Sequence, residues 1–382
     1  MLAAVLTVPR AATAQKVVGA QDGRWSMERA QEWKANHDWT VGANFVPSTA
    51  INQIEMWQGF SFDPDVIDRE LGWAADIGFN TMRVYLHYLV WARDAKGYKD
   101  RIERYLEIAD SHGIKTMFVL QDDVWGDDPN LGPQPDPVPG IHNSAWVESP
   151  GHDQRLQKEM WPMFEAYTKD IISSFADDDR VLMWDLYNEP GNGKSPPEST
   201  LPLLKRTVQW AREAEPSQPI TVGVWNFSDA FSELNEYQLA MSDITTFHTY
   251  EAPEDTKNRV KELRTRTGGR PMMCTEYMAR TRNNTFENHL PYFHDENIGA
   301  INWGLVSGKT NTIYAWPKPR GSDDEYWAKW HKQIREVYPY EDKLRAPEPD
   351  PWFHDVLRRN GEPYDESETE LIGRLSEQPA GE

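Results

Sequence analysis

The chain has 382 residues, of which 39% are hydrophobic and 26% are charged, a balance typical of one large, soluble globular domain. Its formal net charge is −21, which repels the phosphates of nucleic acids and the anionic headgroups of membranes. We therefore expect no nucleic acid and no membrane surface among its partners. A neutral ligand fits better, because 17 Trp and 15 Tyr residues supply flat faces that can stack on sugar rings, although many of them must pack in the core.

The N-terminal segment, residues 1–20, has a short apolar run and a small-residue stretch but no basic start. This pattern indicates a weak or truncated export signal, and it favours a secreted or periplasmic protein over a cytoplasmic one. We expect one domain over residues 21–382. No stretch is long enough to span a membrane. Cys274 is the only cysteine, so neither an intramolecular disulfide nor a cysteine-based zinc cluster can form.

Short apolar runs alternate along the chain with stretches compatible with helices, the pattern of repeated βα units around a parallel sheet. The eight expected strands are 40–45, 80–86, 114–120, 181–187, 220–225, 244–250, 271–277 and 300–306. The expected helices are 64–77, 99–112, 154–175, 201–213, 255–267 and 286–296. We therefore predict an α/β fold, a single-domain (β/α)8 TIM barrel.

A long loop, residues 122–151, joins the third strand to its helix and is rich in Pro, Gly and Asp. Loops of this length in compact domains are usually functional, and this one would lie over the mouth of the barrel, where active sites form. Its Trp125, His142 and Trp146 could contact a ligand, or the loop could be a solvated lid.

A second long loop, residues 307–324, follows the eighth strand and carries Tyr314 and Trp316. We expect a helix near 325–337 after it. The tail from residue 347 onward is expected to pack on the outside of the barrel.

Two glutamates stand at the ends of expected strands. The sequence Trp-Asp-Leu-Tyr-Asn-Glu-Pro ends the fourth strand with Asn188 and Glu189, and Met-Cys-Thr-Glu-Tyr ends the seventh strand with Glu276. Carboxyl groups at these ends point into the barrel mouth, where partial desolvation can favour a proton donor. Retaining hydrolysis of a glycoside needs two carboxyl groups about 5 Å apart, one as acid/base and one as nucleophile. Strands four and seven lie on opposite walls, so the two side chains can converge.

These motifs resemble those of glycoside hydrolase family 5, or of a close relative in the barrel clan with catalytic glutamates at the ends of strands four and seven. The resemblance runs from about residue 40 to residue 306. It implies that Glu189 is the acid/base and Glu276 the nucleophile of a retaining β-glycosidase. The implied partner is a β-linked oligosaccharide or polysaccharide, and the chemistry needs no metal and no cofactor.

The resemblance also assigns residues around the nucleophile. Arg83 on the second strand matches the arginine that keeps the nucleophile charged, and His248 and Tyr250 on the sixth strand match a histidine and a tyrosine of the family. Trp303 on the eighth strand matches the platform for the sugar at subsite −1. A cation and a phenol beside Glu276 would lower its pKa and keep it ionised, whereas the acid/base, without such partners, could stay protonated.

Other polar and aromatic residues at strand ends are candidate sugar contacts, each of which could instead serve packing. They are Asn44, Tyr85, His87, Asn188, Trp225 and Asn226. The third strand ends in Gln121 and Asp122, where many members of the family place a histidine that contacts sugar hydroxyls. Either of these two residues could take the place of that histidine.

Exo-action of a β-mannosidase or β-glucosidase type is slightly favoured, because the two long loops could close one end of the cleft. An open cleft and endo-action of a mannanase, glucanase or xylanase type is the alternative. A non-catalytic carbohydrate-binding barrel is an alternative of another class, but a pure binder has no need of two apposed carboxylates. A metal-dependent barrel hydrolase is disfavoured, because the first strand lacks a His-x-His pair.

Overall fold

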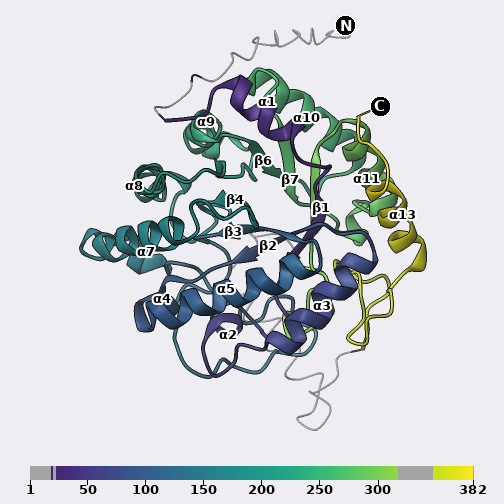
Figure 1. Cartoon of the computed structure of the whole chain (residues 1–382), viewed down its shortest axis with the longest axis horizontal. Helices are drawn as coiled ribbons and strands as arrows, with labels where there is room; N and C mark the ends of the chain where they lie inside the picture. Colours follow the sequence, from purple (N-terminus) through teal and green to yellow (C-terminus); the bar gives the residue numbers. More distant parts are fainter. Residues whose placement is uncertain (1–18, 20–22, 317–346, 382) are drawn as a thin grey trace, which may run out of the picture.

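The computed structural model describes residue 19 and residues 23–316 and 347–381. At its centre lies a parallel sheet in the order β5-β4-β3-β2-β1-β8-β7-β6, with helices around it (Figure 1). The strands are β1 (Val41–Phe45), β2 (Thr81–Tyr85), β3 (Lys115–Val119), β4 (Val181–Asp185), β5 (Ile220–Thr221), β6 (Thr245–His248), β7 (Met272–Glu276) and β8 (Gly299–Trp303). Each of the eight expected strands therefore forms.

The two ends of this strand order, β5 and β6, meet through backbone hydrogen bonds. The amide of His248 donates to the carbonyl of Val224 at 3.0 Å, and the amide of Asp243 donates to the carbonyl of Ile220 at 2.8 Å. A parallel bridge joins Val224 to Phe247. These contacts close the sheet nearly into a barrel, so the predicted (β/α)8 fold is confirmed.

Six helices of the outer layer match the expected ones: α3 (Pro64–Asp76), α5 (Ala95–Ser111), α7 (Trp161–Ser174), α8 (Leu201–Glu213), α10 (Pro253–Thr267) and α11 (Phe286–Asp295). The start of α3 shows why local sequence sufficed, because Asp63 caps it by accepting a hydrogen bond from the amide of Val66, and Pro64 stands in its first turn. The helix expected over 154–175 is divided, and its first part is α6 (His152–Leu156). Gln157 adopts an extended backbone conformation there, which ends α6.

Five further α-helices in the described part of the chain had no counterpart in the expectation: α1 (Met27–Ala35), α2 (Gln53–Trp57), α4 (Tyr88–Arg93), α9 (Ser232–Met241) and α13 (Glu366–Ser376). Of these, α1 has the clearest role. Its Ala30 is fully buried in a cluster with Met117, Met183 and Ile301 from the barrel interior, and Trp33 packs against that cluster. Helix α1 thus closes the N-terminal end of the barrel, and the opposite end, where the strands finish, carries the loops.

The tail was expected on the outside of the barrel, which holds for α13, packed on α11, but not for residues 352–357. The amide of Phe353 donates to the carbonyl of Ile313 at 2.7 Å, and the amide of Val356 donates to that of Leu305 at 3.1 Å. This part of the expectation was wrong, because the buried apolar side chains of Phe353 and Val356 find their partners in the loop after β8.

Two expected segments fall outside the described residues: the export signal, apart from residue 19, and the helix near 325–337. In the part of the chain that the structure describes, no helix is both long enough and apolar enough to cross a membrane.

Candidate active site

A pocket of about 620 Å³ lies at the C-terminal mouth of the barrel. The loops after β3 to β8 and the tail all contribute to its lining. Seven of the residues expected at the site line this pocket: Asn188, Glu189, Trp225, His248, Tyr250, Glu276 and Trp303. The loop residues Trp125, His142 and Trp146 and the candidate Asn226 line it as well. One cavity at the barrel mouth is therefore lined by many of the residues that the sequence pattern indicated.

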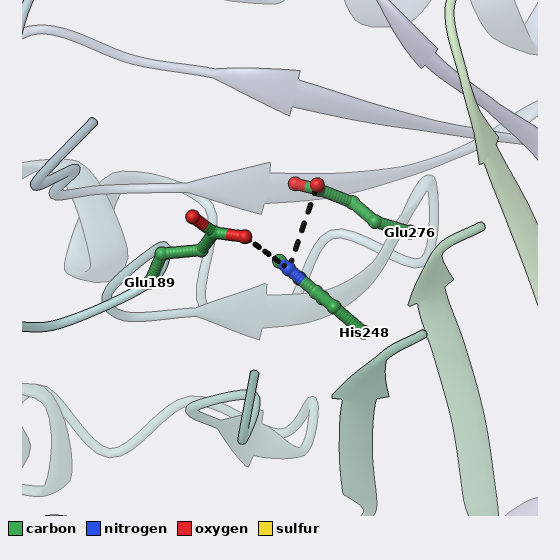
Figure 2. Close-up of side chains that lie close together, drawn as sticks. All are labelled: Glu189, His248 and Glu276. Carbon is green, nitrogen blue, oxygen red and sulfur yellow. Dashed lines mark hydrogen bonds and ion pairs between the residues drawn. The ribbon is translucent and has the colours of Figure 1, made fainter. Parts of the chain in front are cut away.

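Glu189 and Glu276 face each other across this pocket, with His248 between them (Figure 2). One carboxylate oxygen of each glutamate and one ring nitrogen of His248 all lie within 4.8 Å of one another. The Nδ1 atom of His248 is 3.0 Å from Oε1 of Glu189 and 3.5 Å from Oε2 of Glu276. Inverting glycosidases separate their carboxyl groups by about 6.5–9.5 Å to admit a water. The spacing here favours direct attack by one of the carboxylates.

Glu276 is surrounded by hydrogen-bond donors. Arg83 Nη1 and the hydroxyl of Tyr85 each lie 3.0 Å from its Oε1, and the hydroxyl of Tyr250 lies 2.9 Å from its Oε2. Three donors converging on one carboxyl group suit an ionised acceptor. Tyr85 therefore contacts Glu276 and does not line this pocket, a placement that the sequence did not reveal.

The expected direction of the Glu276 pKa was wrong, although its expected neighbours are in place. Burial raises the pKa of the Glu276 carboxyl above its ordinary value, and the nearby charge of Glu189 acts in the same direction. Arg83 and the hydrogen bond from Tyr250 lower that pKa, but they only offset part of the cost of burying a charge.

Arg83 is fully buried and lies behind the pocket wall. Its Nη2 atom is 2.7 Å from Asp185 Oδ2 and 2.8 Å from Asn188 Oδ1, and its Nη1 atom is 2.8 Å from Asn44 Oδ1. Asn44 also donates to the carbonyl of Thr275 at 2.9 Å. Arg83 and Asn44 therefore contact side chains and backbone around Glu276, and neither of them lines the pocket.

Glu189 has partners of its own, of a different kind from those of Glu276. Its Oε1 contacts His248, and its Oε2 accepts a hydrogen bond from Asn192. Burial lowers the pKa of His248 to about 4, so the imidazole is neutral near pH 7 and orients Glu189 by hydrogen bonding. The backbone of Glu189 has a φ of +43°. A left-handed conformation in a non-glycine residue stores strain of about 1–3 kcal/mol, and such residues cluster at functional sites.

Both candidates at the end of β3 have hydrogen-bond partners within the protein. Gln121 accepts a hydrogen bond from Thr207 of α8 at 2.9 Å, on the outer side of the barrel. Asp122 accepts hydrogen bonds from Asn188 Nδ2 at 2.9 Å and from Trp146 Nε1 at 2.7 Å. Neither lines the pocket. Asp122 instead holds Asn188 and Trp146, whose side chains line the pocket.

Aromatic side chains form two walls of the pocket. Trp303 packs edge-on against Tyr85 and Trp146, with ring centroids 5.7 and 5.6 Å apart. On the other side of the mouth, Trp225 is half-buried and donates to the carbonyl of Pro190 at 3.1 Å. His87, by contrast, is fully buried away from the pocket and contacts the carbonyl of Glu148.

Sequence reasoning missed several lining residues, among them His354, Arg259 and Arg282. His354 comes from the tail, far along the chain from any strand end. No local pattern marks it, because only the tertiary path of the tail brings it over the mouth.

The same three side chains, Glu189, His248 and Glu276, also form a possible metal-ligand group among the described residues. The groups around Glu276 are a cation and hydrogen-bond donors, which stabilise the carboxylate anion and disfavour a metal cation beside it. The guanidinium of Arg83 lies 3.0 Å from Glu276, and the two phenols occupy further lone pairs of the same carboxylate. A divalent cation would have to displace these donors.

The family model for Cellulase (glycosyl hydrolase family 5) matches residues 55–338. A curated relative, the probable mannan endo-1,4-beta-mannosidase A-1 of Aspergillus terreus, is 23% identical over 172 residues, which cover 41% of this chain. The alignment spans only 42% of that relative.

Solved structures with a similar fold include three mannoside-related proteins. The GH5_18 protein of Streptomyces cattleya, in complex with Manb1-4GlcNAc, has a TM-score of 0.56 at 13% identity, covering 90% of this chain and 82% of its own. The endo-beta-1,4-mannanase of Thermotoga petrophila has a TM-score of 0.55 at 14% identity, covering 90% and 77%. The exo-beta-1,4-mannosidase of Opitutaceae bacterium strain TAV5 has a TM-score of 0.56 at 15% identity, covering 89% and 59%.

Proposed function

This chain belongs to glycosyl hydrolase family 5 and is a glycoside hydrolase, and from that premise we propose that it removes terminal sugars from β-mannosides with retention of configuration. Glu276 is the nucleophile and Glu189 the acid/base. One observation supports this proposal above all. Inside one cavity, a carboxylate oxygen of each glutamate and a ring nitrogen of His248 lie within 4.8 Å of one another.

In the first step, a carboxylate oxygen of Glu276 attacks the anomeric carbon while Glu189 gives its proton to the departing glycosidic oxygen. Arg83, Tyr85 and Tyr250 supply the hydrogen bonds that hold the attacking carboxylate in place. The bond to the leaving group breaks as the glycosyl ester with Glu276 forms. Neutral His248 keeps the carboxyl group of Glu189 turned toward the reacting oxygen.

In the second step, Glu189 takes a proton from a water molecule, and the oxygen of that water attacks the anomeric carbon. The ester bond breaks, and the Glu276 carboxylate returns to the three donors that stabilise its charge. Two inversions give net retention.

The closed side of the pocket supports exo-action. Hydrogen bonds join the loop after β3 to the loop after β8: the amide of Asn143 donates to the carbonyl of Thr310 at 2.8 Å, and Asn311 Nδ2 donates to that of Val138 at 2.9 Å. This connection forms a wall beside Trp303. A polysaccharide could not continue past such a wall, so only a terminal sugar would fit between it and the glutamates.

The mannoside preference is supported by the relatives, whose names include a probable mannan endo-1,4-beta-mannosidase and an exo-beta-1,4-mannosidase. Endo-action on mannan is the second candidate, and the endo-acting relatives favour it.

Digestion of β-1,4-mannohexaose separates the two modes. An exo-enzyme releases mannose and mannopentaose first, whereas an endo-enzyme gives a mixture of mannobiose to mannotetraose at early times. Proton NMR of the first product in the same reaction reports its anomeric configuration. Initial release of the α-anomer would contradict the double displacement, and hydrolysis of β-glucosides with no hydrolysis of β-mannosides would contradict the sugar assignment.

A further inference from the structure

The tail residue His354 combines features that its packing alone does not explain. It is fully buried, yet it lines the active-site pocket. Its Nδ1 contacts the backbone carbonyl of Met278. Its other ring nitrogen, Nε2, has no hydrogen-bond partner among the described residues. A buried polar atom without a partner is costly, and such atoms in native proteins commonly have a functional reason.

The bond to Met278 fixes the protonation pattern of the ring. A carbonyl oxygen can only accept, so Nδ1 of His354 carries the proton and donates it. Burial lowers the pKa of this imidazole well below its ordinary value, so the ring is neutral near pH 7. Nε2 then carries no proton and can accept a hydrogen bond.

The backbone of Met278, whose carbonyl accepts this hydrogen bond, is strained. Met278 is fully buried just after β7 and has a φ of +73°. A bulky residue in the left-handed region is an outlier that persists only when its surroundings enforce it. Glu189, Trp125 and Asn143, which line the pocket, share such positive φ values. Three of the eight non-glycine residues with positive φ in the described part of the chain thus line the pocket, and the carbonyl of Met278 accepts the hydrogen bond from His354.

His142, from the loop after β3, is arranged in the same way. Its Nδ1 donates to the carbonyl of Tyr314 at 2.8 Å, which leaves Nε2 as the acceptor on a ring that lines the pocket. The two rings are 5.3 Å apart between centroids. Two neighbouring rings, each with one acceptor, can meet two adjacent hydroxyl groups of one sugar ring.

The pair also stands close to the nucleophile. The ring centroid of His354 is 5.5 Å from that of Tyr250, and the hydroxyl of Tyr250 is 2.9 Å from Glu276 Oε2. A sugar whose anomeric carbon meets Glu276 would therefore present its remaining hydroxyl groups to this side of the pocket.

We propose that His354 and His142 are specificity-determining residues for the terminal sugar, each accepting through Nε2 a hydrogen bond from one of two neighbouring hydroxyl groups. They perform a task for which the end of β3 offers only Gln121 and Asp122, neither of which lines the pocket. This inference rests on the proposed glycosidase function and adds the contacts by which that site selects its sugar.

The test uses 4-nitrophenyl β-D-mannopyranoside and its 2-, 3-, 4- and 6-deoxy analogues as probes. The variant His354→Asn keeps a donor where Nδ1 stands, because the amide nitrogen of Asn can occupy that position, but it has no atom at Nε2. For each analogue, kcat/KM is divided by the value for the parent substrate, in the wild type and in the variant. Comparing the two ratios cancels the intrinsic reactivity of each analogue.

In the wild type, one deoxy analogue should lose about 3- to 30-fold in kcat/KM through the missing hydrogen bond to His354. In His354→Asn that loss should shrink to less than twofold, while the other ratios stay as they were. His142→Asn should do the same for a neighbouring position. His354→Gln, which restores an acceptor near Nε2, should recover part of the discrimination.

His294→Gln is the matched control. His294 is buried on α11 and contacts the carbonyl of Gln378 through Nε2, outside the pocket. It should leave every ratio unchanged, and thermal denaturation of all variants confirms folding.

Ratios for all four analogues that are the same in His354→Asn and in the wild type would overturn the role of His354 while leaving the glycosidase function intact. A wild type that hydrolyses no β-glycoside at all would overturn both.

Discussion

The two sides of the pocket differ in how tightly the chain encloses them. On the side of Trp303, the lining residues Trp146, His142 and His354 are buried, and hydrogen bonds connect the loops that carry them. On the side of Trp225, residues 225–227 are only half-buried and Ser228 is exposed. The first side can fix one sugar in one orientation, whereas the second can accept leaving groups of different size.

The two glutamates follow the same division. Glu276 is held by three donors, and its side chain is 6% exposed. Glu189 is 13% exposed and contacts Asn192 of the loop after β4. A nucleophile needs a fixed, dry position, whereas an acid/base must meet both the leaving group and the incoming water. Enclosure on one side and access on the other are what the two proposed roles require.

The largest expected effect separates the two glutamates chemically. Glu276→Gln should reduce hydrolysis of 4-nitrophenyl β-mannoside on the order of 10⁴-fold or more, because the covalent step is lost. Glu189→Ala should cost about 10²- to 10⁴-fold on the same substrate. With a 2,4-dinitrophenyl leaving group, which departs without protonation, Glu189→Ala should still show a burst of phenolate and be accelerated by azide.

Steady-state and burst kinetics with both leaving groups check this pair. The matched variant Glu251→Gln changes a carboxylate at the pocket rim and should keep most of the activity. A burst in Glu276→Gln, or none in Glu189→Ala, would reverse the two roles.

The next effect concerns the donors on the enclosed side. Tyr250→Phe removes one hydrogen bond to the Glu276 carboxylate and should lower kcat/KM about 10- to 100-fold. That hydrogen bond lowers the pKa of Glu276, so its loss raises the pKa further. Activity requires the ionised form and is lost as the pH falls through this pKa. The acid limb of the kcat/KM profile should therefore move to higher pH in Tyr250→Phe.

Profiles of kcat/KM against pH for the wild type and Tyr250→Phe measure this shift. Tyr292→Phe, on the outer helix α11, is the control and should leave the acid limb in place. A limb that moves to lower pH in Tyr250→Phe would contradict the role of this phenol.

A smaller effect is expected on the open side. Trp225→Ala should raise KM for mannotriose and longer oligosaccharides roughly five- to tenfold by removing a stacking surface for the leaving group. The KM for methyl β-mannoside, whose leaving group is too small to reach Trp225, should hardly change. Equal effects on both substrates would indicate that Trp225 instead supports the fold of the loop after β5.

The smallest effect is expected for Gln121→Met. Gln121 faces Thr207, and its Nε2 has no hydrogen-bond partner within the described part of the chain, so an apolar side chain of similar length should fit. Both kcat and KM should stay within about twofold of the wild type. A tenfold rise in KM would indicate that Gln121 contacts the sugar.

Residues at one strand end show where prediction from sequence stops. Gln121 and Asp122 both follow β3, and successive side chains of an extended chain point to opposite sides. The sequence cannot show which of them faces the barrel interior. In β3 this is complicated by a shift in register against β4 between Thr116 and Met117. The structure turns Gln121 outward and Asp122 inward, behind Asn188.

The alternation of strands and helices and the positions of Glu189 and Glu276 at strand ends follow from the sequence alone, because strand patterns, helix caps and strand ends are local properties of the chain. The hydrogen bond from Tyr85 to Glu276, the raised pKa of Glu276 and the place of His354 come only from the tertiary structure. Burial, charge and hydrogen bonding act through space, and at this pocket they join segments more than two hundred residues apart.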